Sequence, residues 1–207
     1  MQDCDAVIFD LGGVLLDINY QATERALRGL LGPRSDHYYQ QTKQSPLFDD
    51  LETGRIEPQH FHQGLVELAG MPLTVEAINQ AWNAMLGRLP IARMAFVEKV
   101  AARRRVFLLS NTNAIHKAAF DQIIAEDLRG KNFDACFEAA YYSHLIGLRK
   151  PHHEVYRYVT DRHGLDPART LFIDDNRENV EGARRAGLQA FHLQGDLLEA
   201  PLDFLWR

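Results

Sequence analysis

Carboxylate, hydroxyl and lysine side chains follow short apolar runs or precede an expected helix at four places in the chain: Asp10, Ser110, Lys150 and the adjacent pair Asp174 and Asp175. If Asp10 meets the pair, carboxylates of ordinary pKa, about 4, would repel one another by on the order of 4 kcal/mol per pair at about 4 Å. A domain that is stable by only about 5–15 kcal/mol needs a cation to offset that repulsion. Oxygen ligands without a cysteine or histidine nearby in the sequence favour Mg²⁺ over zinc, and Lys150 would supply a second positive charge.

Each of these residues also has an ordinary structural interpretation when it is taken alone. Asp10 could end a turn, Ser110 could belong to a helix N-cap, and Lys150 could be a solvated loop residue. Gly12 and Gly13, which follow Asp10 closely, permit a tight turn and close approach of a ligand to the backbone. They do not form a dinucleotide-binding loop, because the third glycine of G-x-G-x-x-G is absent and an acid stands where phosphate would be repelled.

Four apolar runs are the expected strands that would carry these residues. They cover residues 6–9, 106–109, 171–173 and 190–193. Because the runs are mostly continuous rather than alternating, they favour strands that are covered on both faces of a parallel sheet. Helical patterns at 113–125 and 176–187 separate the later runs, and the alternation predicts an α/β fold with a doubly wound, Rossmann-like core. Ligands of such sheets bind at the carboxyl ends of the strands, where Asp10 and Ser110 are expected.

The segment between the first and second expected strands has helical periodicity throughout. Apolar residues recur at helical spacing within 22–31, 61–69 and 78–86, and a glycine follows each stretch. A helical block inserted after one strand of an α/β core is typical of a cap that covers the binding edge of the sheet. We therefore expect a core formed by residues 1–17 and 91–207, with an inserted helical cap at residues 18–90.

The composition is that of an ordinary globular protein, with 207 residues and a formal net charge of −5 at pH 7. Phosphate-backbone binders normally carry a basic surplus, so nucleic acid is not expected as the main partner. Two cysteines, Cys4 and Cys136, are too few for a disulfide framework and are expected to be buried thiols. Residues 1–5 lack the basic start of a signal peptide, and no apolar stretch reaches the roughly 20 residues that span a bilayer. We expect a soluble, cytoplasmic chain without a membrane partner, and the sequence indicates no oligomeric state.

The order of the four motifs resembles that of the haloacid dehalogenase superfamily of hydrolases. The similarity extends to a branch of sugar-phosphate phosphatases, like the glucose-1-phosphate phosphatases, that carries F-D-x-G-x-V, S-N-T-N, G-x-x-K-P and D-D-x-x-x-N. These motifs are residues 9–14, 110–113, 147–151 and 174–179 here, and the stretch 48–56 of the expected cap also resembles this branch. The resemblance covers the whole chain and implies a helical cap of the C1 type, inserted after the first motif.

The resemblance implies that Asp10 is the nucleophile of a phosphatase that acts on small phosphorylated metabolites, and that it forms an aspartyl-phosphate intermediate. Ser110 and the Asn111 backbone N–H would hold a phosphoryl oxygen. Lys150 would neutralise the nucleophile and the phosphate together, so it would contribute both to substrate binding and to catalysis.

The resemblance also implies a Mg²⁺ cofactor that acts as a template and a charge clamp. The Asp10 carboxylate, the Gly12 backbone carbonyl and Asp175 would hold the metal ion. Asp174 would be a supporting or alternative ligand, and Asn179 would help to orient the site.

Gly12 departs from the pattern of most phosphatases in the superfamily, which carry a second aspartate there. That aspartate protonates the leaving oxygen and then deprotonates water, and such general acid–base help is worth about 10²–10⁴ in rate. Another group could replace it, with Asp17, His60 and His62 as candidates that also have plain structural interpretations. Otherwise turnover is slow, or the substrate has an acidic leaving group. We favour the last alternative, with sugar 1-phosphates and aryl or acyl phosphates as the expected substrates.

Three other interpretations use the same residues. A phosphate-binding or regulatory protein could keep the fold and lose turnover through Gly12, although it would have no need of a nucleophile. A phosphorylation-receiver domain fits poorly, since it places its acid pair before the phosphoacceptor and has no helical insertion. A metal-free dehalogenase would leave Asp174 and Asp175 without a counterion. Selectivity would come from cap side chains, and Glu52 and Arg55 are candidates to face the cleft.

Overall fold

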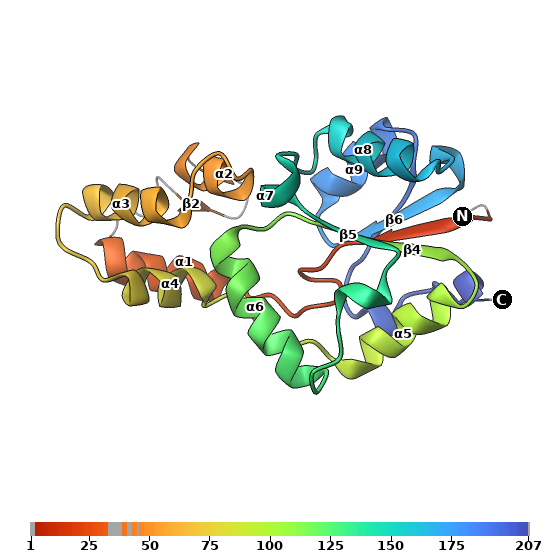
Figure 1. The fold of residues 1–207 in the computed structure, drawn as a ribbon, viewed down its shortest axis with the longest axis horizontal. Helices are drawn as coiled ribbons and strands as arrows, with labels where there is room; N and C mark the ends of the chain where they lie inside the picture. The colour runs from red at the N-terminus through yellow and green to blue at the C-terminus, as the bar shows by residue number, and fades with distance from the viewer. Residues whose placement is uncertain (1–2, 33–38, 41–42, 45, 207) are drawn as a thin grey trace.

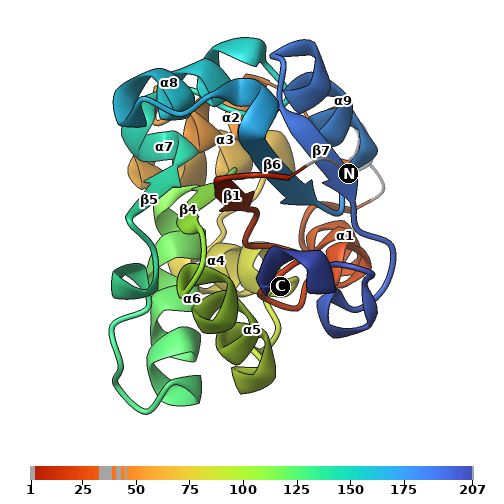
Figure 2. The same cartoon turned by 90° about the vertical axis from the view of Figure 1, so that its right-hand side faces the viewer.

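The computed structural model describes residues 3–32, 39–40, 43–44 and 46–206. At its centre lies a five-stranded sheet in the order β5-β4-β1-β6-β7, and every neighbouring pair of these strands runs parallel. The strands are β1 (Ala6–Phe9), β4 (Arg105–Ser110), β5 (Ala139–Tyr142), β6 (Thr170–Asp174) and β7 (Gln189–His192). The predicted doubly wound α/β core is therefore confirmed, as Figures 1 and 2 show.

Helices cover both faces of the sheet. Val7 and Phe9 belong to the buried cluster that includes α5 (Ile91–Ala101) and α6 (Ala114–Asp127). Ile8 belongs to the opposite cluster, with α8 (His153–His163) and α9 (Arg177–Arg185). Because successive residues of β1 are buried on opposite faces, the strand reads as a continuous apolar run. The described core also contains α7 (Ser143–Ile146) and the 3₁₀ turns η2 (Asp134–Cys136), η3 (Pro167–Arg169), η4 (Leu197–Glu199) and η5 (Asp203–Trp206).

The described residues from Tyr20 to Asn83 form a helical layer at one end of the sheet (Figure 1). Its elements are α1 (Tyr20–Leu31), the antiparallel pair β2 (Tyr39–Gln40) and β3 (Lys43–Gln44), α2 (Pro46–Glu52), α3 (Pro58–Ala69) and α4 (Val75–Asn83). This layer has a buried cluster of its own, in which the rings of Phe48, Phe61 and Trp82 contact one another at centroid separations of 5.1–5.7 Å. A separate apolar cluster is what an inserted cap requires, and the bounds 18–90 stay a prediction.

Two linkers join the helical layer to the core and pair with each other. Ile18 and Leu86 form an antiparallel bridge, and the Gly87 N–H donates to the Asp17 carbonyl at 2.8 Å. A Cβ on Gly87 would lie 2.8 Å from that carbonyl oxygen, so the linkers approach closely because residue 87 is glycine. The third expected cap helix consequently ends at Asn83, before Gly87, because Gly87 is used in this linker contact.

The two cysteines differ in burial. Cys4 is free and buried as expected, whereas Cys136 is free but only partly buried, because it lies in the short turn η2 rather than in a strand. Burial raises the pKa of both thiols. Among the residues that the structure describes, no helix combines the length and the apolar character needed to cross a membrane.

Candidate active site

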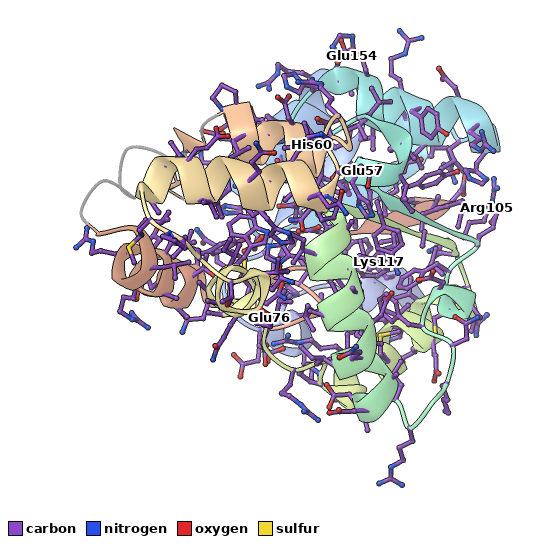
Figure 3. All side chains as sticks on the ribbon, turned by 60° about the vertical axis from the view of Figure 1, so that its left-hand side comes forward. Glu57, His60, Glu76, Arg105, Lys117 and Glu154 are labelled. Atoms are coloured by element: carbon purple, nitrogen blue, oxygen red, sulfur yellow. The ribbon has the colours of Figure 1, made fainter. Side chains whose placement is uncertain are left out.

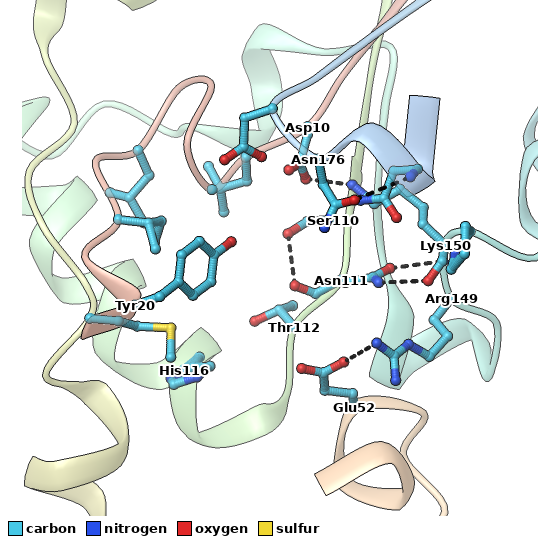
Figure 4. Close-up of a pocket in the computed structure, with 18 of the residues that line it drawn as sticks. Asp10, Tyr20, Glu52, Ser110, Asn111, Thr112, His116, Arg149, Lys150 and Asn176 are labelled. Atoms are coloured by element: carbon cyan, nitrogen blue, oxygen red, sulfur yellow. Dashed lines mark hydrogen bonds and ion pairs between the residues drawn. The ribbon is translucent and has the colours of Figure 1, made fainter. Parts of the chain in front are cut away.

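The carboxyl ends of three neighbouring strands bring the predicted residues together. Asp10 follows β1, Ser110 ends β4 and Asp174 ends β6, with Asp175 next in the chain. Since β1 pairs with both β4 and β6, these strand ends are adjacent. A cleft of about 800 Å³ opens between this edge of the sheet and the cap, and Asp10, Ser110, Lys150 and Asp175 line it (Figure 4).

Lys150 lies at the centre of the acidic cluster and is 1% exposed. Its Nζ is 2.6 Å from Asp10 Oδ1 and donates to Asp174 Oδ2 at 2.8 Å and to the Leu109 carbonyl at 2.9 Å. Three acceptors match the three N–H donors of an ammonium group. Lys150 is therefore a fixed part of the site and not a solvated loop residue.

Asp174 is fully buried and holds other site residues in place. Besides Lys150, it accepts from Asn179 Nδ2 at 3.0 and 3.2 Å and from the Asn176 backbone N–H at 2.7 Å. Asn176 also caps α9, because its side chain accepts from the N–H groups of Glu178 and Asn179. Both oxygens of Asp174 thus accept hydrogen bonds from donors of the protein.

Negative charge exceeds positive charge in this cluster. Burial raises the pKa of Asp10 to about 8, and repulsion from Asp174 and Asp175 adds to the shift while Lys150 opposes it. Burial, and then repulsion from Asp174, raise the pKa of Asp175 to about 6. Although burial opposes the charge of Lys150, the Asp10 and Asp174 carboxylates raise its pKa. Oxygens of the three acids lie within 4.8 Å of one another, and such an all-oxygen set with excess negative charge fits a divalent cation such as Mg²⁺.

The glycines after Asp10 allow neighbouring side chains to approach the first motif closely. Gly13 has φ +76°, and a Cβ at this residue would lie 2.2 Å from Asp175 Oδ2. The Asp175 carboxylate can therefore approach the first motif only because residue 13 has no side chain. A Cβ on Gly12 would lie 3.1 Å from Ile18 Cγ1, so the space beside residue 12 is already filled from the linker to the cap.

Ser110 and Asn111 occupy the positions expected of a phosphate-binding loop. The Ser110 hydroxyl is 3.5 Å from the Asn111 carbonyl, the long limit of a hydrogen bond, and it borders the cleft. The Asn111 side chain donates to the Lys150 carbonyl at 2.9 Å and accepts from the Lys150 backbone N–H at 2.9 Å. This reciprocal pair joins the second and third motifs, and sequence reasoning, which used only the Asn111 backbone, missed it.

Several residues singled out from the sequence lie away from the cleft. The Asp17 carboxylate is 2.7 Å from Arg93 Nη1 and helps to hold the linker. His60 is exposed on the outer surface of α3 (Figure 3), and His62 Nε2 is 2.8 Å from Asn79 Oδ1 of α4. Arg55 is also exposed, and its guanidinium contacts Asp50 at 2.8 Å rather than the cleft.

The cap wall of the cleft contributes polar groups of its own. Glu52, at the end of α2, is 9% exposed, and its Oε2 is 3.1 Å from Arg149 Nη2 (Figure 4). Arg149 also pairs with Asp49, so this core residue contacts two acids of the cap. Tyr20, the first residue of α1, directs its hydroxyl into the cleft toward the space between Asp10 and Ser110. Arg149 lies within the motif at residues 147–151, beside Lys150, so the sequence drew attention to it. Tyr20 belongs to no motif and to no periodic apolar pattern, so the sequence did not.

His116 lies where α6 of the core meets α4 of the cap. Its ring stacks on Trp82 at a centroid separation of 4.5 Å, and its Nδ1 is 2.8 Å from Asn83 Oδ1. Burial lowers the pKa of His116 to about 3. The ring is therefore neutral at physiological pH, and its contacts join the cap to the core.

Comparisons with known proteins agree with this geometry. The family model of haloacid dehalogenase-like hydrolases matches residues 4–187. A D-ribitol-5-phosphate phosphatase of Bacteroides thetaiotaomicron is 27% identical over 89% of both chains, and a sesquiterpene phosphatase of Aspergillus oryzae is 30% identical over 93% of this chain and 91% of its own. A crystal structure of a variant HAD family enzyme from Bacteroides thetaiotaomicron, in complex with magnesium and inorganic phosphate, has a TM-score of 0.88 and 26% identity over 99% of both chains.

Proposed function

This chain belongs to the haloacid dehalogenase-like hydrolases and is a phosphoric monoester hydrolase of that family, and we propose that it is a Mg²⁺-dependent phosphatase of sugar or polyol phosphates. The proposal includes an aspartyl-phosphate intermediate at Asp10. The observation that carries it is the joint position of Asp10, Lys150 and Asp175 in one cleft beside Ser110. A nucleophile, a fixed cation and a second carboxylate in one place are the parts that phosphoryl transfer needs.

Asp10 would attack phosphorus with one carboxylate oxygen, and the bond between phosphorus and the ester oxygen would break. The contact of Lys150 Nζ with Asp10 Oδ1 at 2.6 Å keeps the carboxylate oriented and offsets its charge as the phosphate approaches. Water would then attack the phosphorus of the acyl phosphate, and the Asp10 carboxylate would be regenerated with release of inorganic phosphate. Splitting hydrolysis into two displacements is the usual gain of covalent catalysis.

The phosphoryl oxygens would be held by the Ser110 hydroxyl and the Asn111 backbone N–H. The reciprocal hydrogen bonds between the Asn111 side chain and the Lys150 backbone, both at 2.9 Å, keep this loop in register with the lysine. Donors that are positioned before the reaction do not need to reorganise during it, which is the main source of electrostatic catalysis.

Mg²⁺ would be held by Asp10, Asp175 and the Gly12 backbone carbonyl. When bound, it would neutralise the phosphoryl group and the carboxylates and fix the substrate between them. The raised pKa values of Asp10 and Asp175 support this assignment, because burial, together with repulsion from the neighbouring acids, disfavours their ionised forms, and a bound cation would offset that cost. Asp174 would instead position Lys150 and Asn179, since its oxygens already accept their hydrogen bonds.

The substrate class rests on the cap wall of the cleft. The Glu52 carboxylate and the Tyr20 hydroxyl could accept or donate hydrogen bonds to several hydroxyl groups of a sugar or polyol. Apolar side chains such as Trp82 and Met85 line the same cleft, and one relative is named as a sesquiterpene phosphatase. A prenyl chain would remove water from the ion pair of Glu52 with Arg149 and offer no hydrogen bonds in exchange, which costs free energy. A sugar or polyol can replace those hydrogen bonds, so it fits this cleft better.

A catalytically weak or inactive phosphate-binding protein of the same fold is the second candidate, and the glycine at residue 12 favours it. The buried Asp10–Lys150 pair opposes it. Binding phosphate alone does not require a buried carboxylate beside the anion, because that carboxylate repels it.

Phosphate release from a panel of substrates tests the proposal. The panel contains p-nitrophenyl phosphate, ribitol 5-phosphate, glucose 1- and 6-phosphate and farnesyl phosphate, each assayed with MgCl₂ and with EDTA. We expect turnover of the sugar and polyol phosphates with Mg²⁺, at most trace activity with EDTA, and none with Asp10→Asn. Preference for farnesyl phosphate would contradict the substrate class, and absence of turnover in the whole panel would favour the phosphate-binding protein.

A further inference from the structure

Gly12 has no side-chain proton to donate. A Cβ on Gly12 would lie 3.1 Å from Ile18 Cγ1 and 3.5 Å from Ile18 Cδ1, so a side chain at this residue would require the Ile18 side chain to shift by a few tenths of an ångström. The Ile18 backbone is bridged to Leu86 of the second linker. A group that protonates the leaving oxygen is therefore sought elsewhere in the cleft.

Three other donors that border the cleft do not suit this role. Lys150 Nζ contacts three acceptors. The Arg149 guanidinium is paired with Asp49 and Glu52 of the cap. His116 Nδ1 contacts Asn83, and its ring stacks on Trp82 at the cap side of the cleft.

Tyr20 is the donor whose position fits the reaction. It is the first residue of α1, and this helix start is fixed by the Asn19 side chain, which accepts from the Ala22 N–H at 3.2 Å, and by the Asn19 N–H, which donates to the Met85 carbonyl at 2.8 Å. The ring packs against the apolar cluster of the cap. The hydroxyl points from the cap wall into the cleft that Asp10 and Ser110 also line (Figure 4). The attacking and leaving oxygens lie in line across phosphorus, so the ester oxygen of a phosphate attacked by Asp10 would face away from Asp10.

We propose that the Tyr20 hydroxyl is the general acid of this enzyme and replaces the carboxyl group that residue 12 lacks. The proposal rests on the phosphatase function proposed above. A phenol, with an ordinary pKa of about 10, is protonated at neutral pH and is a stronger acid than the alcohol of a sugar or polyol. It can therefore give a proton to an alkoxide leaving group that would otherwise depart as an unstable anion.

The proton inventory balances over the two displacements. In the first, an Asp10 oxygen bonds to phosphorus, the ester P–O bond breaks with its electron pair on the leaving oxygen, and the Tyr20 O–H proton moves to that oxygen. In the second, the Tyr20 oxyanion takes a proton from the attacking water while the water oxygen bonds to phosphorus and the bond to Asp10 breaks. One phosphate ester and one water become one alcohol and one phosphate, and Tyr20 returns to its starting state.

The proposal changes the expectation drawn from Gly12. A site without a general acid predicts that the rate of the unaltered enzyme falls steeply as the leaving group becomes less acidic. With the Tyr20 hydroxyl in place, the rate depends only weakly on the leaving group, and the steep dependence appears when the hydroxyl is removed.

A series of aryl phosphates tests this difference: p-nitrophenyl, 4-cyanophenyl, phenyl and 4-methoxyphenyl phosphate, with kcat and KM measured at saturating Mg²⁺. For Tyr20→Phe we expect kcat/KM, which reports the first displacement, to fall by about 100-fold on 4-methoxyphenyl phosphate but by less than about threefold on p-nitrophenyl phosphate, because p-nitrophenolate needs no proton. Tyr20→His should restore part of the lost rate, because imidazole is a proton donor.

Tyr158→Phe is the matched control, since it removes a phenol hydroxyl from α8, outside the residues that line the cleft. Its rates should equal those of the unaltered enzyme over the whole series. An equal loss of kcat/KM on all four esters in Tyr20→Phe, or no loss of kcat/KM, would overturn the role of Tyr20 as general acid and leave the proposed function intact. Absence of turnover by the unaltered enzyme, or full activity in Asp10→Asn, would overturn the proposed function and the role of Tyr20 together.

Discussion

The two walls of the cleft are built differently. On the core wall, Asp10 and Asp174 stand at the ends of hydrogen-bonded strands, and Lys150 is held by these two acids and the Leu109 carbonyl. On the cap wall, Glu52 and Tyr20 stand at the ends of helices, and Glu52 is paired with Arg149 of the core. The proposals above assign the reaction to the core wall, and substrate selection and proton donation to the cap wall.

Replacing Lys150 by methionine should produce the largest change. The variant removes the buried cation between two acids, and breaking a buried ion pair typically costs about 3–5 kcal/mol in the free energy of unfolding. Phosphatase activity should fall at the same time by at least about 10³-fold, because nucleophile and phosphate lose their shared counterion. Urea denaturation at pH 7.5 and phosphate release measure the two effects.

Lys131→Met is the control for that variant, because Lys131 is exposed near the end of α6. It should alter the free energy of unfolding by less than about 0.5 kcal/mol. If the two variants were equally stable, the core wall would not depend on its buried cation in the way described here.

Because His116 is buried in its neutral form, the free energy of unfolding should decrease as the pH falls. The folded pKa of about 3 lies below the ordinary value of 6.5, so the folded protein binds fewer protons than the unfolded chain between these values. The contribution is therefore complete above about pH 6.5 and is lost as the pH falls toward 3. Between pH 7 and 4.5 the unaltered protein should lose about 3 kcal/mol relative to His116→Gln.

Denaturation curves of both proteins at several pH values measure this difference, and the acids of the active site titrate in both, so their effect cancels. Parallel pH profiles for the two proteins would show that His116 is not held neutral between core and cap.

Gly13→Ala should weaken metal binding by displacing Asp175, while the contacts of Lys150 stay in place. A Cβ would lie 2.2 Å from Asp175 Oδ2 and residue 13 has φ +76°, so the substitution costs about 1–2 kcal/mol and displaces a proposed metal ligand. We expect at least about tenfold weaker Mg²⁺ binding by calorimetry.

Gly29→Ala is the matched substitution, since Gly29 lies in α1 with no atom within 4 Å of a new Cβ. It should stabilise the protein by up to about 1 kcal/mol and leave Mg²⁺ binding unchanged. Equal Mg²⁺ affinity in the two variants would count against Asp175 as a ligand.

Glu52→Gln should give the smallest effect, and it should appear in KM. Loss of the charge that faces Arg149 and the substrate hydroxyls should raise KM for a sugar phosphate by about fivefold, with kcat changed less than about twofold. KM for p-nitrophenyl phosphate, which has no sugar hydroxyls, should stay the same. Arg55→Gln, exposed on the outer cap, should change neither constant, and an equal effect of both variants would remove Glu52 from substrate selection.

The core wall was largely predictable from the sequence, and the cap wall was not. The strands that end at Asp10, Ser110 and Asp174 are continuous apolar runs because both faces of the sheet are covered, so their carboxyl ends could be aligned without a structure. The edge strand β5 was not among the predicted strands, because its short Ala-Ala-Tyr-Tyr run lacks the bulky aliphatic residues of the other strands and its first two residues are only partly buried.

Which cap residues face the cleft depends on how the cap packs on the core, and the periodicity of the sequence does not show this. Glu52 was named with Arg55, and only the position of α2 over the core distinguishes the buried acid from the exposed arginine. Tyr20 was missed because it is the first residue of its helix, where one aromatic side chain gives no repeating pattern.

Covalent trapping at Asp10 tests the central claim most directly. The enzyme is mixed with ³²P-labelled substrate and Mg²⁺, quenched in acid within one turnover, and digested for peptide mass spectrometry. The account predicts a phosphoryl group on the peptide that contains Asp10, labile to hydroxylamine as an acyl phosphate, and no label in Asp10→Asn. Label on a different residue, or undiminished phosphate release by Asp10→Asn, would contradict it.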